Sequence, residues 1–431
     1  MAGGPLPGSL PQGSDQPPGL YAWSVFALLC LLGLLDFGVR QLLVGIFPLV
    51  KAEWHLSFEA QGKLAAVVPL MVGLTMLPMA LLIDRWSRVK AIFLMALVWS
   101  LATIGCGIAI NYNQMMLARG LMGLGEAAYG PAGFALLAWY FPLRLRATVL
   151  GGVMAAGSFG NVAGIALGGV LAQRIGWHQT FIYVGLFSLA VSFLVLLVRD
   201  YPTQPRPAQH GAKAGGAGAG AMRLFRALVL SPTAFFAYMG GACFLFVLST
   251  LVSFLPTFLG SAYHLPVDQA AIRAAAAVLC GAIGAVLWAQ VADRWGTRNA
   301  NGRLYVPMLA ALACAALFGS AFLLLPPGPL QFGLILAGAF LMTAHLGAVN
   351  TVVMDVVEPG LRASSAAMVG VAQNLLGIAA GPLVVGVISD RWGLEAALGV
   401  LPVFASIAAL CFWLSSRYYP NERAVFSTAA V

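Results

Sequence analysis

The sequence predicts an all-α membrane protein with twelve transmembrane helices, arranged as two six-helix repeats. Three observations support this fold class. Of the 431 residues, 61% are hydrophobic and only 9% are charged, whereas a soluble domain carries about 25% charged residues. Apolar runs long enough to cross a bilayer recur along the whole chain. Short motifs of the first half of the chain also return in the second half.

Twelve apolar runs are long enough to span a bilayer as helices. Six of them precede a polar break in the chain: 21–50, 58–83, 90–110, 114–140, 147–171 and 177–198. Six follow that break: 233–260, 269–292, 304–325, 330–356, 363–388 and 394–416. Gly permits close packing of membrane helices and Pro is tolerated in them. The 50 Gly and 24 Pro of the chain therefore fit this assignment.

The polar break divides the chain into two parts. Residues 199–226 contain a polar stretch and then a Gly/Ala-rich stretch, which is typical of a linker. We therefore expect an N-terminal six-helix bundle at 21–198, a cytoplasmic linker and a C-terminal six-helix bundle at 227–416. Residues 1–20 are rich in Pro and Gly and contain no Lys or Arg, so we expect a disordered cytoplasmic tail rather than a signal peptide. Residues 417–431 are expected to form a second cytoplasmic tail.

Motif pairs relate the two halves of the chain. An Asp-Arg pair follows the second run at 84–85 and the eighth run at 293–294. The sequence FPLRLRAT precedes the fifth run at 141–148, and EPGLRASS precedes the eleventh run at 358–365. Two parallel repeats of this kind are an architecture used by transporters whose substrate site lies between the halves.

The distribution of Lys and Arg predicts the orientation in the membrane. With the N-terminus in the cytoplasm, cytoplasmic segments hold 16 of the 23 Lys and Arg residues and external loops hold 5. We therefore expect both termini in the cytoplasm. We expect the membrane to be a bacterial inner membrane. The net charge of +9 then comes mainly from cytoplasmic loops, and we expect the lipid bilayer and no nucleic acid as a partner.

Four charged residues lie inside the first and fourth apolar runs: Asp36, Arg40, Arg119 and Glu126. A charge at bilayer depth costs at least about 2.5–3.5 kcal/mol on insertion scales, so it marks a pathway for ions or charged solutes or is paired. Arg119 and Glu126 are two helical turns apart and share one face of their helix. Asp36 and Arg40 are one turn apart and can pair directly.

These four charges suggest a coupling chemistry. With both acids ionised, their charges sum to zero. Protonation of one acid leaves a net positive charge, which an anion can neutralise, and this is a basis for proton–anion symport. Two structural salt bridges are the alternative interpretation.

The loops after the second and eighth runs resemble a loop motif of the major facilitator superfamily, and the whole match covers roughly residues 20–416. The matching residues are Asp84, Arg85 and Arg88 in the first loop and Asp293, Arg294 and Arg298 in the second. The resemblance implies that the aspartate caps a neighbouring helix end and pairs with an arginine, which latches the outward-open state. A simple topogenic charge cluster is the alternative.

A longer pattern resembles the anion:cation symporter branch of this superfamily. It runs from Arg119 to Glu126 as RGLMGLGE, continues with WYFP at 139–142, and returns between Asn374 and Asp390. Spinster-type lipid transporters share the Gly-Glu-Ala element and are the nearest alternative to this branch.

The first helix departs from the pattern of the branch, which usually has adjacent Asp and Arg there. Arg40 matches the arginine, but Val39 occupies the position of the aspartate. Asp36 lies one turn earlier and either takes over the role of the acid or neutralises Arg40.

The resemblance also implies roles for individual residues. It implies that Arg40 contacts a substrate carboxylate, that Glu126 carries protons close to Arg119, and that Asn374 lies in the substrate cavity. The apolar runs of the second half contain three further polar candidates for substrate binding: His345, Asn350 and Gln373. A single His on an apolar helix is more often a hydrogen-bonded packing residue.

We therefore expect a monomeric secondary transporter that symports a small organic anion with protons by alternating access. The resemblance implies that sugar-acid carriers of the branch have a tyrosine near the second run, but residues 65–77 contain none. A cavity lined by apolar residues favours a carboxylate with an apolar body. A proton-coupled exporter of a drug-like or lipid substrate on the same fold is the alternative. The sequence shows no catalytic cluster and no metal-ligand spacing, so we expect neither an enzyme nor a bound cofactor or metal. Export and sodium coupling are the alternatives to uptake and proton coupling.

Overall fold

The computed structural model describes residues 19–83, 87–127, 129–200, 231–299, 301–357 and 362–428, and these residues form helices without any strand. The helices before the linker are α1 (Leu20–Trp54), α2 (Phe58–Ile83), α3 (Arg88–Ile108), α4 (Tyr112–Glu126), α5 (Tyr129–Tyr140), α6 (Leu143–Ile175), α7 (Trp177–Leu194) and the short η1 (Val195–Leu197). Ten helices of the described chain are long and apolar enough to cross a membrane.

The helices after the linker include two π-helical segments, η2 and η4. In chain order they are α9 (Pro232–Ala262), α10 (Val267–Arg298), α11 (Gly302–Gly319), η2 (Ser320–Leu324), α12 (Pro329–Leu341), α13 (Leu346–Asp355), α14 (Arg362–Ala372), η4 (Gln373–Ala379), α15 (Ala380–Trp392), α16 (Leu394–Leu398) and α17 (Leu401–Thr428). The last helix extends beyond residue 416, where the predicted run ends.

Three predicted runs are interrupted in the structure, one of them at residues 399–400, where the run at 394–416 divides into α16 and α17. The run at 114–140 breaks after Glu126 into α4 and α5, and the run at 330–356 breaks at residues 342–345 into α12 and α13. Polar side chains bond to backbone carbonyls at the break at 342–345: Thr343 donates to Gly281 across to α10, and His345 Nδ1 lies 3.2 Å from the Met342 carbonyl oxygen. Hydropathy alone does not reveal these breaks, because the residues around them are apolar.

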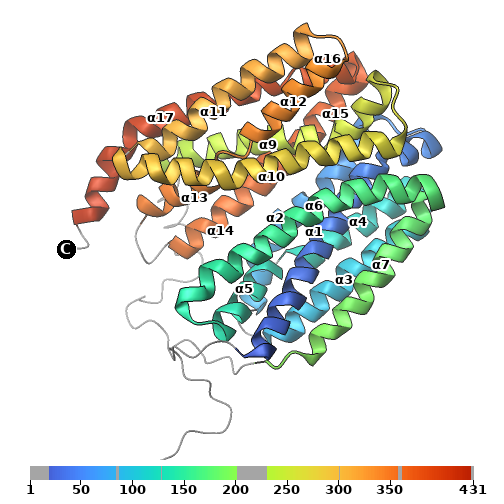
Figure 1. The fold of residues 1–431 in the computed structure, drawn as a ribbon, viewed down its shortest axis with the longest axis horizontal. Coiled ribbons are helices and arrows are strands. Elements are labelled where there is room, and N and C mark those ends of the chain that lie inside the picture. Colours follow the sequence, from blue (N-terminus) through green and yellow to red (C-terminus); the bar gives the residue numbers. More distant parts are fainter. Residues whose placement is uncertain are drawn as a thin grey trace, which may run out of the picture.

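The helices pack as two groups, which we call the first helix group (α1–α7) and the second helix group (α9–α17). In the first group α1 packs on α6, α3 on α7 and α2 on α4; in the second, α17 packs on α9 and α11, and α10 on α12. The two groups meet where α6 faces α10 and where α2 faces η4 and α15. Figure 1 shows the second group lying along the first, with α6 and α10 at their boundary.

Glycines at four-residue intervals bring α1 and α6 together. A Cβ atom at Gly160 or Gly164 would collide with the backbone of α1, and one at Gly168 would lie 2.6 Å from the Leu42 carbonyl oxygen. Small residues with this spacing let two membrane helices approach at backbone distance. The close packing fixes the position of α1, the helix that carries two of the four predicted membrane charges.

The two groups are joined at the end of the molecule where α1 turns into α2, which we call the loop end. Near the end of α15, the Asp390 carboxylate accepts hydrogen bonds from the backbone N–H groups of Phe58 and Glu59 at 2.7 and 2.9 Å. These are the first residues of α2, whose N–H groups have no partner within their own helix. A carboxylate of the second group thus caps a helix of the first group, where it also meets the positive end of the helix dipole.

A buried amide continues this junction deeper between α2 and α9. Gln61 is fully buried, and its Nε2 donates to the Ser253 carbonyl oxygen at 3.2 Å and to Thr257 Oγ1 at 3.0 Å. Hydrogen bonds between helices stabilise membrane bundles because lipid offers the polar groups no partner. The loop-end half of the interface is therefore held by directed polar contacts as well as by packing.

We predict that Asp390→Ala weakens the junction at the loop end, because α2 loses its cap. The expected cost is about 1 kcal/mol, the usual cost of removing a helix cap. Spin labels placed on both groups at the loop end should report a broader distance distribution and a larger separation. Glu395→Ala removes an exposed acid from neighbouring α16 and serves as the control. An Asp390→Ala distribution that matches the wild type would show that the cap does not hold the groups together.

Candidate functional site

An ion pair between two helices forms the centre of the candidate site. Arg40 on α1 donates from Nε to Glu126 Oε2 at 2.7 Å, and its Nη2 contacts the same oxygen. Glu126 is the last residue of α4. Its side chain is 1% exposed, whereas that of Arg40 is 20% exposed. The carboxylate is thus enclosed, while part of the guanidinium remains accessible.

This pairing differs from the direct Asp36–Arg40 pair that the one-turn spacing permitted. The structure pairs Arg40 with Glu126 on the neighbouring helix, because the long arginine side chain reaches across to α4 and the short aspartate does not. Asp36 is buried, and its Oδ1 has no hydrogen-bond partner. It lies close enough to both Arg40 and Glu126 to interact with them electrostatically.

Arg119 is the fourth member of the cluster and is fixed by a backbone carbonyl. Its Nε donates to the Leu64 carbonyl oxygen of α2 at 2.8 Å, and its Nη1 is buried without a partner. It interacts electrostatically with Glu126 and Arg40, but it forms no hydrogen bond with Glu126. The four predicted residues thus converge within the first helix group, with one direct ion pair among them.

Two aromatic residues complete the surroundings of the cluster. The Arg40 guanidinium carbon lies 5.5 Å from the centre of the Phe37 ring, a distance at which a cation is attracted to an aromatic face. The Tyr129 hydroxyl donates to the Leu29 carbonyl oxygen at 2.7 Å and lies near enough to Asp36 to interact with it. A signal for Tyr129 exists in the sequence, since it is a hydroxyl-bearing residue three positions after Glu126 in an apolar run.

Two of the polar candidates in the second helix group lie against the same glycine of α9. A Cβ atom at Gly241 would lie 3.5 Å from Gln373 Nε2 and 3.6 Å from His345 Cδ2. His345 is fully buried, and because its Nδ1 faces the Met342 carbonyl oxygen, Nδ1 carries the proton and Nε2 is an acceptor. Both His345 Nε2 and Gln373 Nε2 are buried without a partner.

The other two candidates lie apart from this pair. Asn374 donates to the Gly370 carbonyl oxygen of its own helix at 2.9 Å, and its Cβ faces Gly73 of α2 at the interface between the helix groups. Asn350 is exposed and donates to the Leu346 carbonyl oxygen at 3.2 Å. Both Gln373 and Asn374 belong to the π-helical segment η4, and π-helical turns occur frequently at functional sites.

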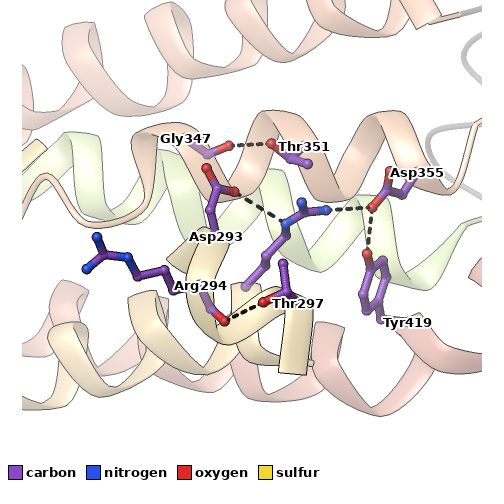
Figure 2. A network of polar contacts seen from close by, with 8 residues as sticks. Asp293, Arg294, Thr297, Gly347, Thr351, Asp355 and Tyr419 are labelled. Carbon is purple, nitrogen blue, oxygen red and sulfur yellow. Dashed lines mark hydrogen bonds and ion pairs between the residues drawn. The ribbon is translucent and has the colours of Figure 1, made fainter. Parts of the chain in front are cut away.

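One predicted loop residue of the second half, Asp293, belongs to a polar network that is centred on Arg303, an arginine outside the motif. Asp293 Oδ1 lies 3.6 Å from Arg303 Nε, whose guanidinium also lies 3.3 Å from Asp355 Oδ2. The Tyr419 hydroxyl donates to the same Asp355 oxygen at 2.7 Å. Figure 2 shows how this network links α10, α11, α13 and α17 through one arginine side chain.

The remaining loop residues lie outside this network. Asp84 and Arg85 lie outside the described residues, and Arg88 begins α3. Neither Arg294 nor Arg298 forms an ion pair with another described residue; both line a hollow on the surface beside Trp295. The arginine that pairs with Asp293 is therefore Arg303, because consecutive residues of one helix point in different directions while the start of α11 lies alongside α10.

The family model described as Major Facilitator Superfamily matches residues 29–382. The chain is 26% identical to an MFS-type efflux pump of Mycolicibacterium smegmatis, over 93% of this chain and 94% of that protein. It is 24% identical to the Probable L-galactonate transporter of Escherichia coli, over 79% of this chain and 77% of that protein.

A solved structure has the same fold. It is a bacterial homologue of the human lysosomal transporter Spinster in an inward-facing, unoccupied conformation, with a TM-score of 0.84, 24% identity and coverage of 95% of this chain and 99% of that one. The resemblance inferred from the motifs is thus confirmed. This chain, which crosses the membrane several times as helices, belongs to the Major Facilitator Superfamily, a superfamily of membrane transporters and not of enzymes.

Proposed function

We propose that the protein symports a small organic anion with protons by alternating access between two six-helix halves. The ten spans of the described chain, together with α2 and the α4–α5 pair, would make twelve, and the two helix groups would be the two halves. The excess of Lys and Arg in alternate loops supports cytoplasmic termini in a bacterial inner membrane. We propose that the transporter acts as a monomer.

The observation that carries this proposal is the Arg40–Glu126 ion pair. A substrate carboxylate that binds the Nε and Nη2 side of Arg40 would compete with Glu126 Oε2, which accepts from both nitrogens in this structure. Protonation removes the charge of Glu126 and weakens its hold on Arg40, so the guanidinium becomes free for the anion. Proton and anion then bind together, because the anion replaces the charge that the proton cancels. Arginine suits this role, since its planar fork holds a carboxylate by two parallel hydrogen bonds.

Asp36 and Arg119 adjust the charge of the same site. The four side chains carry no net charge when both acids are ionised, and one bound proton leaves a single positive charge for the anion to neutralise. Asp36 is buried without a guanidinium partner, and a neutral carboxyl costs less to bury than a carboxylate. We propose that Asp36 assists Glu126 in holding the coupling proton, while Arg119 supplies a fixed positive charge.

We propose that the second helix group supplies the remaining substrate contacts. Gln373 and His345 offer a buried donor and a buried acceptor beside Gly241, and Asn374 faces the interface between the groups. Asn350 would contact the substrate only from an exposed position. For the loop residues, the ion pairs of Arg303 support a latch that includes Asp293, with Asp84, Arg85, Arg88, Arg294 and Arg298 as further proposed members.

An exporter is the second candidate function, because one relative is an MFS-type efflux pump. The same two acids would then give substrate affinity the opposite pH dependence. A cationic substrate would compete with the proton for Glu126 and Asp36, and its affinity would rise as the pH rises. An anionic substrate gains affinity as the pH falls. The sign of the pH dependence of binding therefore separates the two functions.

We predict that Arg40→Ala abolishes binding of organic acids, whereas Arg40→Lys retains part of it. An ammonium group keeps the charge but lacks the two-pronged geometry of a guanidinium. Affinity is measured by the rise in melting temperature of the purified protein with each acid, because a ligand stabilises the state that binds it. Arg174→Ala, at an exposed position on α6, is the control. Near-normal affinity in Arg40→Ala would place the anion elsewhere.

We predict that Glu126→Gln uncouples transport while leaving binding intact. The amide mimics the protonated carboxyl permanently, so the variant should bind anion at every pH tested and exchange it across the membrane. It should lose accumulation driven by a proton gradient. The measurement is uptake into proteoliposomes with and without an imposed gradient, together with counterflow, and Glu395→Gln serves as the control. Gradient-driven accumulation that survives in Glu126→Gln would shift the role of obligatory proton carrier to Asp36.

A further inference from the structure

A small cavity of about 150 Å³ lies between the two helix groups. Residues of α1 and α6 form one wall, and residues of α9, α10 and the segment 342–346 form the other. In Figure 1 this is the boundary along which α6 and α10 face each other. Pockets that enclose a whole small molecule measure about 300–1,000 Å³. This cavity therefore has the size for one part of a substrate.

The wall of the cavity is apolar except for a few uncharged polar groups. Gln41, Ser158 and Asn161 lie on the first helix group, and Thr343 lies on the second. Leu248 and Met342 are among the apolar residues around them, and no charged side chain occurs in the described lining. A cavity of this composition suits an uncharged polar group on an apolar body.

The hydrogen bonds of these polar groups determine which partner they accept. Ser158 donates its hydroxyl proton to the Met154 carbonyl oxygen at 3.1 Å, and Thr343 donates its own to the Gly281 carbonyl oxygen at 2.9 Å. Each hydroxyl has a single proton, so both can now only accept. Asn161 Oδ1 is buried and has no partner. Ser158, Thr343 and Asn161 Oδ1 therefore present acceptors, while the amide groups of Gln41 and Asn161 also carry N–H donors. A guest group that both donates and accepts is complementary to this wall.

The described wall of the cavity has no negatively charged side chain, and this limits which chemical groups can bind in it. An ammonium group would donate, but burial of an unpaired charge is costly. A hydroxyl group donates without carrying a charge. It would satisfy Asn161 Oδ1, an atom whose burial without a partner costs about as much as a lost hydrogen bond.

The cavity adjoins the charge cluster. Gln41 directly follows Arg40 on α1, and the Phe37 ring lies between Arg40 and α6, where a Cβ atom at Gly157 would contact it at 2.7 Å. Asn161 is one helical turn beyond Gly157 on α6. An anion that is held by Arg40 and reaches Asn161 would therefore pass the Phe37 ring.

We infer that this cavity binds a hydroxyl group of the transported anion, with Asn161 Oδ1 as the acceptor. The inference rests on the proposed function and narrows its substrate class to hydroxylated carboxylates with an apolar body. Asn161 is then a specificity residue, because it touches the substrate away from the carboxylate that Arg40 holds.

The test compares two carboxylates that differ by one hydroxyl group, 3-hydroxydecanoate and decanoate. The wild-type protein should bind the hydroxylated acid about tenfold more tightly, as measured by calorimetry on the purified protein. Asn161→Leu should erase this preference and bind decanoate at least as well as the wild type does. Gln173→Leu replaces an exposed amide of the same helix and should keep the preference. Asn161→Ala is the second variant if Asn161→Leu fails to fold, with the same expected result.

A labelling experiment places the hydroxyl in the cavity directly. In a variant without the six native cysteines, Ala282→Cys on the α10 wall should react with a maleimide more slowly when 3-hydroxydecanoate is present than when decanoate is present. Equal affinity of the wild type for the two acids would overturn the inference, and so would a preference that survives Asn161→Leu. Failure to bind either acid by a protein that binds other organic anions would also overturn it.

Arg40→Ala separates this inference from the proposed function. If Arg40→Ala loses both acids, the anion site is at Arg40 and the hydroxyl preference refers to the same substrate. If Arg40→Ala binds both acids and still prefers the hydroxylated one, the proposed anion site fails while the cavity assignment stands.

Discussion

The ion pair between Arg40 and Glu126 is the interaction on which the proposed transport cycle depends. Removal of one partner of a buried ion pair typically costs about 3–5 kcal/mol, because the other charge is left uncompensated. Arg40 therefore requires a negative partner at every stage. Glu126 supplies it in this structure, and a bound anion can supply it when Glu126 is protonated. This requirement, and not the affinity of any single group, would couple the two binding events.

The packing of the first helix group brings these charges together. The glycines of α6 hold α1 at backbone distance, which fixes the position of Asp36 and Arg40 relative to α6. The break after Glu126 ends α4 beside α1. At the loop end, Asp390 caps α2 across the interface between the helix groups. Water can replace a carboxylate at an exposed helix end, so such a cap would suit the opening of this interface in the proposed cycle.

Much of this arrangement could be predicted from the sequence, because hydropathy and glycine spacing depend on local composition. The helices, and the presence of Asp36, Arg40, Arg119 and Glu126 inside two apolar runs, follow from such patterns. The partners of the charged side chains could not be predicted from the sequence. Arg40 pairs with a residue of another helix, Arg119 donates to the Leu64 backbone, and Asp293 pairs with Arg303. Side-chain reach across helices depends on packing that no periodicity encodes. The cavity beside Asn161 is likewise a product of two surfaces that meet only in the folded chain.

The central claim is that protonation of Glu126 removes the negative charge beside Arg40 and that a bound anion supplies a new one. It is tested most directly by counting protons when an organic acid binds to the purified protein in weakly buffered solution, with a pH indicator as the readout. Binding and protonation at one site must affect each other reciprocally. The account predicts uptake of about one proton for each anion bound near neutral pH by the wild type, and none by Glu126→Gln. Anion binding to the wild type without proton uptake would contradict it.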